Sequence, residues 1–333
     1  MSASPQLLLG PILKDVSRSF YTTLRILPRG IRSQIGLAYL LARTTDTIAD
    51  TSLMPIERRL LALDQLRQRI LGSSQVRIDT AEWAQKQNSG AERILLENCE
   101  QALALLESFS DSDRELIRKV LDIITSGQEL DLRRFGSASA NAIVALRTGA
   151  ELDDYTYRVA GCVGEFWTRI CRTHLFPKSR LDDAFLMSNG VRFGKGLQLV
   201  NILRDLPADL RNGRCYLPSE RLVQINLSPA SLLQPENEPR LRPLYNSCLD
   251  LSEAHLRAGW EYTKALPRRQ MRVRLACAWP ILIGLETLKL LRRENVLDAA
   301  KPAKVSREAV KRIIRRSVLL YPFRRAWESL VNR

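Results

Sequence analysis

The chain has little histidine and lacks long apolar runs. Of its 333 residues only His174 and His255 are histidines, and neither belongs to an H-E-x-x-H pattern. These two residues cannot form a three-histidine zinc site. No window holds the roughly 18 uninterrupted apolar residues that a spanning helix needs. No positively charged segment precedes the apolar run 7–9, so we expect no secretory leader.

Runs that alternate Val, Ile, Thr and aromatic residues are also missing, and apolar residues recur at steps of three and four. This spacing predicts helices over residues 31–48, 56–71, 93–109, 114–132, 154–175, 181–203, 244–265 and 275–293. Residues 80–90 and 228–243 are predicted connections, and Pro207 is expected between helical segments. The sequence thus predicts an all-α protein of about ten helices. We expect one domain over residues 1–333, with an N-terminal extension (1–16) and a basic C-terminal tail (307–333).

Positive charge is in excess. Lys and Arg total 51 against 36 Asp and Glu, a formal net charge of +15. The expected partners are therefore anions: nucleic acid, anionic lipid or a phosphorylated small molecule. The cations are spread along the chain and no zinc-finger or RNA-binding signature appears, so a helical nucleic-acid-binding protein is a remote alternative and no nucleic-acid partner is expected. Six cysteines without C-x-x-C spacing predict reduced, buried thiols in a cytoplasmic protein.

Two D-x-x-x-D motifs lie about 160 residues apart in the sequence. The first contains Asp46 and Asp50, and the second contains Asp205 and Asp209. Residues four apart share one helix face, where two carboxylates repel unless a cation lies between them. Carboxylate oxygens suit Mg²⁺, which keeps several waters and is often shared with substrate phosphates.

A single acidic pair is more often a solvated surface feature than a metal site. Here apolar helical turns lead into both motifs, and an arginine accompanies each, Arg43 in the first and Arg204 in the second. Metal and guanidinium together neutralise the charge that develops when a diphosphate leaves. The context therefore favours a diphosphate site over the surface alternative.

Five segments resemble the squalene and phytoene synthase family in the family's order: Ser17-Arg18-Ser19-Phe20, residues 43–50, residues 155–164, residues 198–209 and residues 213–218. The resemblance implies the isoprenoid-synthase fold, a single helical bundle around a central apolar cavity with the two acid motifs facing across its mouth. It implies the cofactors Mg²⁺ and NADPH, and farnesyl diphosphate as substrate.

The resemblance also assigns roles to residues. Asp46, Asp50, Asp205 and Asp209 are the expected Mg²⁺ ligands and, with Tyr155, the catalytic set. The expected substrate-binding residues are Ser17, Arg18, Arg43, Gln198, Asn201, Arg204 and Arg214. The expected NADPH contacts are Arg18, Arg43, Arg204, Lys304 and Arg307. The chain departs from the family's pattern at Ala49 and Ala208, where an additional acid is common, so the metal site would rest on four aspartates.

The expected activity is squalene synthase: head-to-head joining of two farnesyl diphosphates through presqualene diphosphate, followed by reduction with NADPH. The similarity of residues 277–290 to the late helix of squalene synthases favours this product. Presqualene diphosphate, dehydrosqualene or phytoene synthase are alternatives within the family, and an inactive scaffold protein is another. The tail is expected either to lie on an anionic membrane surface or to form a final core helix with a solvated cationic side. Enzymes that process squalene are expected downstream partners.

Overall fold

The computed structural model describes residues 4–17, 21–298, 300 and 303–332. The chain forms two compact units, Met1–Gly136 with Phe166–Lys178, and Ser137–Glu165 with Ser179–Arg333. Regular structure in the described ranges is almost entirely helical, which confirms the predicted all-α class. No helix in these ranges has both the length and the apolar composition needed to cross a bilayer. The single domain stays a prediction.

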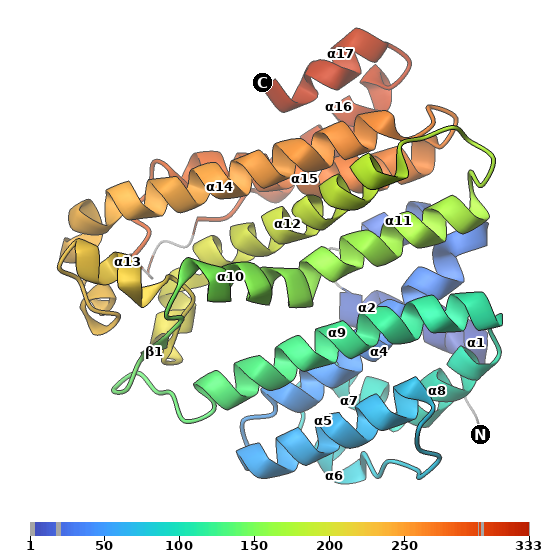
Figure 1. Cartoon of the computed structure of the whole chain (residues 1–333), viewed down its shortest axis with the longest axis horizontal. Coiled ribbons are helices and arrows are strands. Elements are labelled where there is room, and N and C mark those ends of the chain that lie inside the picture. The colour runs from blue at the N-terminus through green and yellow to red at the C-terminus, as the bar shows by residue number, and fades with distance from the viewer. Residues whose placement is uncertain (1–3, 18–20, 299, 301–302, 333) are drawn as a thin grey trace. The chain divides into compact units, whose positions relative to one another are not determined.

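The first unit is built around the long helix α4, which packs against α5, α8 and α9 (Figure 1). Its elements are α1 (Pro5–Leu7), η1 (Leu8–Ile12), α2 (Leu13–Ser17), α3 (Tyr21–Ile26), α4 (Arg29–Asp50), α5 (Ile56–Leu71), α6 (Ala81–Gln85), α7 (Gly90–Glu97), α8 (Cys99–Glu107), α9 (Asp111–Phe135) and most of α11 (Cys162–His174). Ile31, Leu37, Leu41 and Ile48 of α4 are fully buried. This apolar face holds α4 in place, so the acid motif at its C-terminal end has a rigid base.

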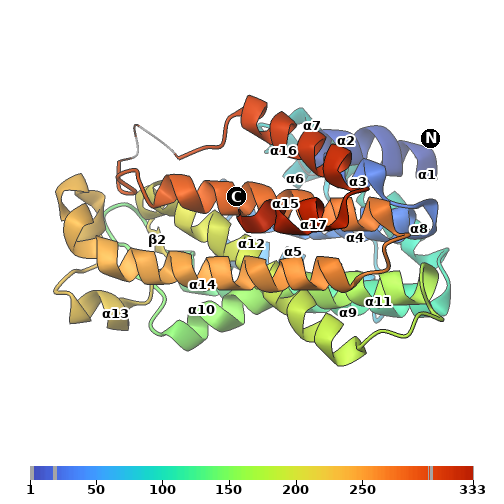
Figure 2. The same ribbon diagram turned by 90° about the horizontal axis from the view of Figure 1, so that it is seen from above.

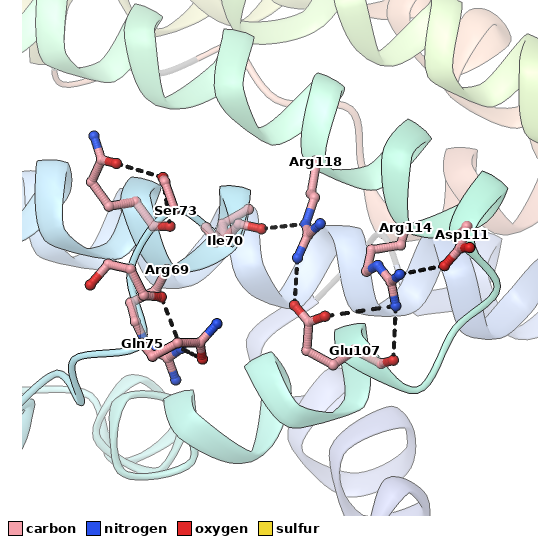
Figure 3. Close-up of polar contacts among 10 residues, drawn as sticks. Arg69, Ile70, Ser73, Gln75, Glu107, Asp111, Arg114 and Arg118 are labelled. Atoms are coloured by element: carbon pink, nitrogen blue, oxygen red, sulfur yellow. Dashed lines mark hydrogen bonds and ion pairs between the residues drawn. The ribbon is translucent and has the colours of Figure 1, made fainter.

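Arginine side chains tie the ends of three helices of this unit together (Figure 3). Arg118 on α9 donates from Nε to the carbonyl of Ile70 at the end of α5 (2.9 Å) and from Nη2 to Glu107 at the end of α8 (2.6 Å). Arg114 donates to the Glu107 carbonyl and pairs with Asp111. The last carbonyls of a helix have no partner within the helix, and these guanidinium groups supply one.

The second unit is centred on α12, which packs against α14, α15 and η3 (Figure 2). Its elements are β1 (Val144–Ala145), α10 (Gly149–Thr156), η3 (Tyr157–Gly161), the first residues of α11, α12 (Asp183–Arg211), β2 (Arg214–Cys215), α13 (Ser219–Gln224), η4 (Ala230–Leu233), η5 (Pro235–Asn237), α14 (Glu238–Ala265), α15 (Met271–Leu291), α16 (Arg307–Leu320), α17 (Arg324–Glu328) and η6 (Ser329–Asn332). Leu203 on α12, Leu249 on α14 and Ile281 on α15 belong to its buried core.

Two short strands, which the sequence does not predict, lie next to candidate site segments: β1 precedes α10, and β2 follows α12. β1 and β2 pair in parallel, with Val144 opposite Arg214 and Ala145 opposite Cys215. The turn into β2 is made by Gly213 at a φ of +79°, and a Cβ there would lie 2.3 Å from the Ser139 amide nitrogen. Only glycine fits this turn, which fixes the start of the segment carrying Arg214.

The position of Pro207 corrects a prediction, because it lies inside α12 rather than between helical segments. Proline has no N–H to donate to the carbonyl four residues earlier, which is that of Leu203. The buried Tyr245 hydroxyl on α14 donates to this carbonyl at 2.8 Å. The helix therefore continues through the second acid motif to Arg211.

Several other predicted boundaries are wrong. The helix predicted over 93–109 is divided at Asn98, whose side-chain amide donates to the Ile94 carbonyl and competes with the helical backbone. The helix predicted over 154–175 contains the π-helical segment η3. The two predicted connections also hold helical structure: α6 lies within 80–90, and η4, η5 and the start of α14 lie within 228–243.

Candidate active site

The first acid motif occupies the C-terminal end of α4, where Asp46 and Asp50 lie one turn apart as predicted. The Arg43 guanidinium bridges two carboxylates, pairing with Asp46 through Nη1 and with Glu92 of α7 through Nη2. The side chains of Arg43 and Glu92 are 26 % and 19 % exposed. Glu92 was not among the predicted residues, because its spacing to Ser89 indicates only a helix N-cap.

Acidic groups are crowded at this motif. Partial burial, together with the nearby Asp50 carboxylate, raises the pKa of Asp46 to about 6, although Arg43 opposes the shift. Burial lowers the pKa of Arg43, but Asp46 and Glu92 outweigh it and leave that pKa above its ordinary value. A cation between the two aspartates would relieve the part of this shift that comes from the Asp50 carboxylate.

Buried polar groups hold the end of α4. The buried Arg59 guanidinium donates to the Ala49 carbonyl at 3.0 Å. The hydroxyls of Thr44, Thr47 and Thr51 donate to carbonyls one turn earlier. These threonines are satisfied by the backbone, so the carboxylates of Asp46 and Asp50 are the groups of this turn suited to a cation.

The second acid motif lies in the last turns of α12. Arg204 makes a bidentate pair of hydrogen bonds with Asp205: Nε donates to Oδ1 at 2.8 Å and Nη2 donates to Oδ2 at 2.6 Å. This hydrogen bonding, which outweighs burial, raises the pKa of Arg204. Gln198, Asn201, Asp205 and Asp209 follow at steps of three and four, so they share one face of the helix, as predicted.

Tyr155 lies at the end of α10, just before η3, and is 8 % exposed. Its ring stacks on that of Tyr216, with centroids 4.9 Å apart, and the two hydroxyls are 3.4 Å apart. Tyr216 follows β2 and is 6 % exposed. The sequence includes Tyr216 in a matched segment but gives it no role. The stack joins the predicted catalytic tyrosine to the segment that carries Arg214.

The remaining predicted residues are spread over the two units. Ser17 is buried and its hydroxyl donates to the Leu13 carbonyl at 2.5 Å. Arg18 lies outside the described residues. Lys304 and Arg307 are exposed, in the segment before α16 and at its first residue. The structure places Arg43 in the first unit and Arg204, Arg214, Lys304 and Arg307 in the second.

Within the part of the chain that the structure describes, no three His, Cys, Asp or Glu side chains come together in a way that would hold a metal ion. Each motif offers two carboxylates, without the additional acid that Ala49 and Ala208 replace. This pair fits Mg²⁺ only if water and substrate oxygens complete its coordination, which is the usual arrangement for Mg²⁺ bound to phosphates.

Comparison with known proteins gives consistent matches. A family model for squalene/phytoene synthase matches residues 13–309. Presqualene diphosphate synthase of Rhodopseudomonas palustris is 29 % identical over 254 residues, 76 % of this chain and 77 % of that protein. Squalene synthase of Schizosaccharomyces pombe is 26 % identical over 285 residues, 83 % of this chain and 57 % of that protein. A bifunctional lycopene cyclase/phytoene synthase of Blakeslea trispora is 29 % identical over 218 residues, 63 % of this chain.

The chain thus spans only 32 % of the Blakeslea protein and 57 % of the yeast enzyme. Among solved structures, TcSQS in complex with the ligand E5700 matches with a TM-score of 0.77 and 22 % identity, covering 99 % of this chain and 96 % of the other. That likeness shows the fold. With the family model matching nearly the whole chain, the protein belongs to the squalene/phytoene synthase family.

Proposed function

We propose that this protein is a squalene synthase that joins two farnesyl diphosphates and reduces the product with NADPH. The observation that carries the proposal is the arginine–aspartate pairing at the end of a long helix in each unit, Arg43 with Asp46 and Arg204 with Asp205. Two cation-binding, diphosphate-binding turns are what a reaction with two diphosphate leaving groups requires. The match to the family and to a squalene synthase supports the choice.

In this proposal Asp46, Asp50, Asp205 and Asp209 hold Mg²⁺. The bound ion supplies positive charge to the departing diphosphate. Arg43 and Arg204 bind diphosphate oxygens next to these carboxylates, as Arg18 and Arg214 do. Gln198 and Asn201, on the same face of α12 as Asp205, contact the substrate chain.

The first step breaks the C–O bond of one farnesyl diphosphate and releases diphosphate. The double bond of the second farnesyl group attacks the allylic cation, and loss of a proton gives presqualene diphosphate. The stacked, buried Tyr155 offers its ring face to the cation and its hydroxyl to the proton. In the second step the remaining diphosphate leaves. Lys304 and Arg307 would hold NADPH, which would supply the hydride that converts the resulting cation to squalene.

Presqualene diphosphate synthase is the second candidate, favoured by the 29 % identity over 77 % of the Rhodopseudomonas relative. Such an enzyme performs the first step and leaves reduction to another protein. Dehydrosqualene or phytoene synthesis would keep the same joining step and end by loss of a proton instead of hydride transfer.

The test is incubation of the purified chain with farnesyl diphosphate and Mg²⁺, with and without NADPH, followed by mass analysis of the lipid and diphosphate fractions. Squalene formed only with NADPH supports the proposal. Presqualene diphosphate in both samples would identify a presqualene diphosphate synthase. Dehydrosqualene would identify an enzyme whose reaction ends by loss of a proton instead of hydride transfer. The absence of any C30 product rejects a head-to-head synthase acting on farnesyl diphosphate.

Matched variants connect the activity to the site. Asp46→Asn and Asp205→Asn should each lower turnover by about 10²-fold or more, because charge stabilisation of the leaving group is a large catalytic effect. Asp64→Asn, an exposed aspartate on α5, should leave turnover unchanged. Equal losses in all three variants would show that the effect is not specific to the two motifs.

A further inference from the structure

The outer face of α16 carries unpaired positive charge. Lys311, Arg312, Arg315 and Arg316 are all exposed, and in the described ranges none of them has an ion-pair partner. Glu308 is the only acidic residue of this helix, against these four cations and Arg307. The steps of one, three and four residues place the four cations on one side of the helix.

Large apolar side chains lie within and beside this basic face. Leu319 is 68 % exposed and Phe323, just after the helix, is 65 % exposed. Leu319 follows Arg315 and Arg316 by four and three residues, so it shares their side of α16. A shallow hollow of about 610 Å³ runs along the helix and is lined by the four cations with Glu308, Leu319 and Leu320.

The opposite face of α16 is firmly attached to the second unit. Ser317 is fully buried and accepts a hydrogen bond from Trp279 Nε1 at 2.9 Å. The Tyr321 hydroxyl donates to the Arg268 carbonyl at 2.7 Å. α16 packs along α15 (Figure 2). The helix therefore cannot turn its cations inward, and the basic face is held outward on a rigid base.

We propose that this face, formed by Lys311, Arg312, Arg315, Arg316, Leu319 and Phe323, docks the protein on an anionic lipid surface. Charge complementarity selects the partner: closely spaced cations attract a surface of anionic headgroups. The two exposed apolar side chains select lipid over other polyanions, because they can enter the boundary between headgroups and acyl chains. An anionic polymer offers no comparable apolar layer.

The test uses the full chain without substrate, so its outcome does not depend on the proposed activity. Binding is measured by co-sedimentation with vesicles of phosphatidylcholine alone or with about one third phosphatidylserine. Each cation near such a surface strengthens binding on the order of fivefold. The variant Lys311→Gln/Arg312→Gln/Arg315→Gln/Arg316→Gln should thus bind anionic vesicles roughly 10²-fold more weakly, or worse.

The matched control removes four exposed cations elsewhere: Arg77→Gln, Lys178→Gln, Arg180→Gln and Arg293→Gln. It has the same net charge and should bind within about threefold of wild type. A second variant, Leu319→Ser/Phe323→Ser, keeps every charge and should bind about tenfold more weakly.

Three results would overturn the proposal. Wild type that binds neutral and anionic vesicles equally, or neither, removes the charge argument. A control variant that loses as much as the α16 variant shows a net-charge effect with no defined face. The third result is that the protein binds duplex DNA as tightly as vesicles at equal phosphate concentration, with Leu319→Ser/Phe323→Ser having no effect. That result would show a surface for polyanions in general instead of one for lipid.

Discussion

Asp46 shows how the neighbours of one side chain set its chemistry. Burial and the Asp50 carboxylate favour the protonated form of its carboxyl, whereas Arg43 favours the charged form. The net result is a pKa of about 6. A carboxyl whose pKa is raised by folding holds its proton more tightly in the folded protein than in the unfolded chain. The stability that this proton contributes is full below about pH 4 and is lost as pH rises towards 6.

Asp46→Asn removes this titration. At pH 7 without divalent cations the variant should be more stable than wild type by about 1 kcal/mol, a discounted figure because the Asp46 side chain is 38 % exposed. The difference in stability between the variant and wild type should shrink at pH 4. Urea denaturation at pH 7 and at pH 4 measures it. The control Asp64→Asn should have the stability of wild type at both pH values. A variant that is less stable than wild type at pH 7 would mean that the Arg43 pair outweighs the repulsion.

Tyr216 stacks on Tyr155, so we expect it to hold the Tyr155 ring in position. Tyr216→Phe keeps the stacked ring and loses the hydroxyl contact, so a loss of a few fold in turnover is expected, whereas Tyr216→Leu should lose about tenfold or more. The readout is kcat for C30 formation, with KM little changed. Tyr262→Leu, at another buried tyrosine on α14, should lose stability but keep the turnover of the folded enzyme. If Tyr216→Leu changed only stability, a positioning role would be ruled out.

At the scale of elements, the second acid motif depends on a contact between helices. The Leu203 carbonyl, deprived of its helical donor by Pro207, accepts from Tyr245 on α14. Burial raises the pKa of Tyr245, so this hydroxyl keeps its proton and remains a donor. A contact on α14 therefore compensates for the proline two residues after Asp205.

Tyr245→Phe should lower the free energy of unfolding by about 1–3 kcal/mol, because it leaves a buried carbonyl without this partner. In a Pro207→Ala background the new backbone N–H can satisfy Leu203, so the same substitution should cost less. Urea denaturation of the four proteins in this double-mutant cycle gives the coupling. Additive effects would show that the hydroxyl does not compensate for the proline.

The backbones of η3 and α12 lie very close together where the two helices cross. A Cβ on Gly194 would lie 2.1 Å from the Ala160 carbonyl oxygen, a backbone atom that cannot turn away. Gly194→Ala should therefore destabilise the protein by about 2 kcal/mol or more and lower Tm. Gly90→Ala, where a Cβ meets nothing within 4 Å, is the control and should leave Tm unchanged or slightly raised. Equal Tm values for the two variants would contradict the close packing.

At the scale of the whole molecule, the basic C-terminal segment is part of the core of the second unit. Trp327 is 2 % exposed, stacks on Trp260 at 4.7 Å between centroids, and lies under the Arg274 guanidinium at 4.7 Å. Trp260 Nε1 donates to the Glu328 carbonyl at 3.0 Å. The structure thus agrees with the expectation of a final core helix with a solvated cationic side, whereas contact of residues 307–333 with a membrane stays a proposal.

Trp327→Ala should destabilise the protein by about 3–5 kcal/mol, as expected for a buried aromatic side chain. It should also shift the tryptophan emission to longer wavelength, because Trp260 loses its stacking partner and gains water. Phe323→Ala, exposed on the same segment, is the control and should change neither. If Trp327→Ala unfolded like wild type, residues 307–333 would be an appendage to the core.

The sequence by itself determined the helical class, most helix positions and the face of each acid pair. These depend on local spacing: Asp46 and Asp50, like Asp205 and Asp209, share a face in any helix. Five ordered motifs also identified the family. The prediction for Pro207 was wrong because the deciding group lies far away along the chain: Tyr245 satisfies the Leu203 carbonyl that the proline leaves without a donor.

Only the tertiary structure decided the partners of the candidate site residues. Glu92 bridges to Arg43 from a helix 49 residues away, and Tyr216 stacks on Tyr155 across 61 residues. It also decided that Ser317 and Trp327 are docked while the cations of α16 point outward. The reason is physical: helical periodicity is a property of neighbouring residues, whereas burial, pairing and pKa depend on which distant groups packing brings together.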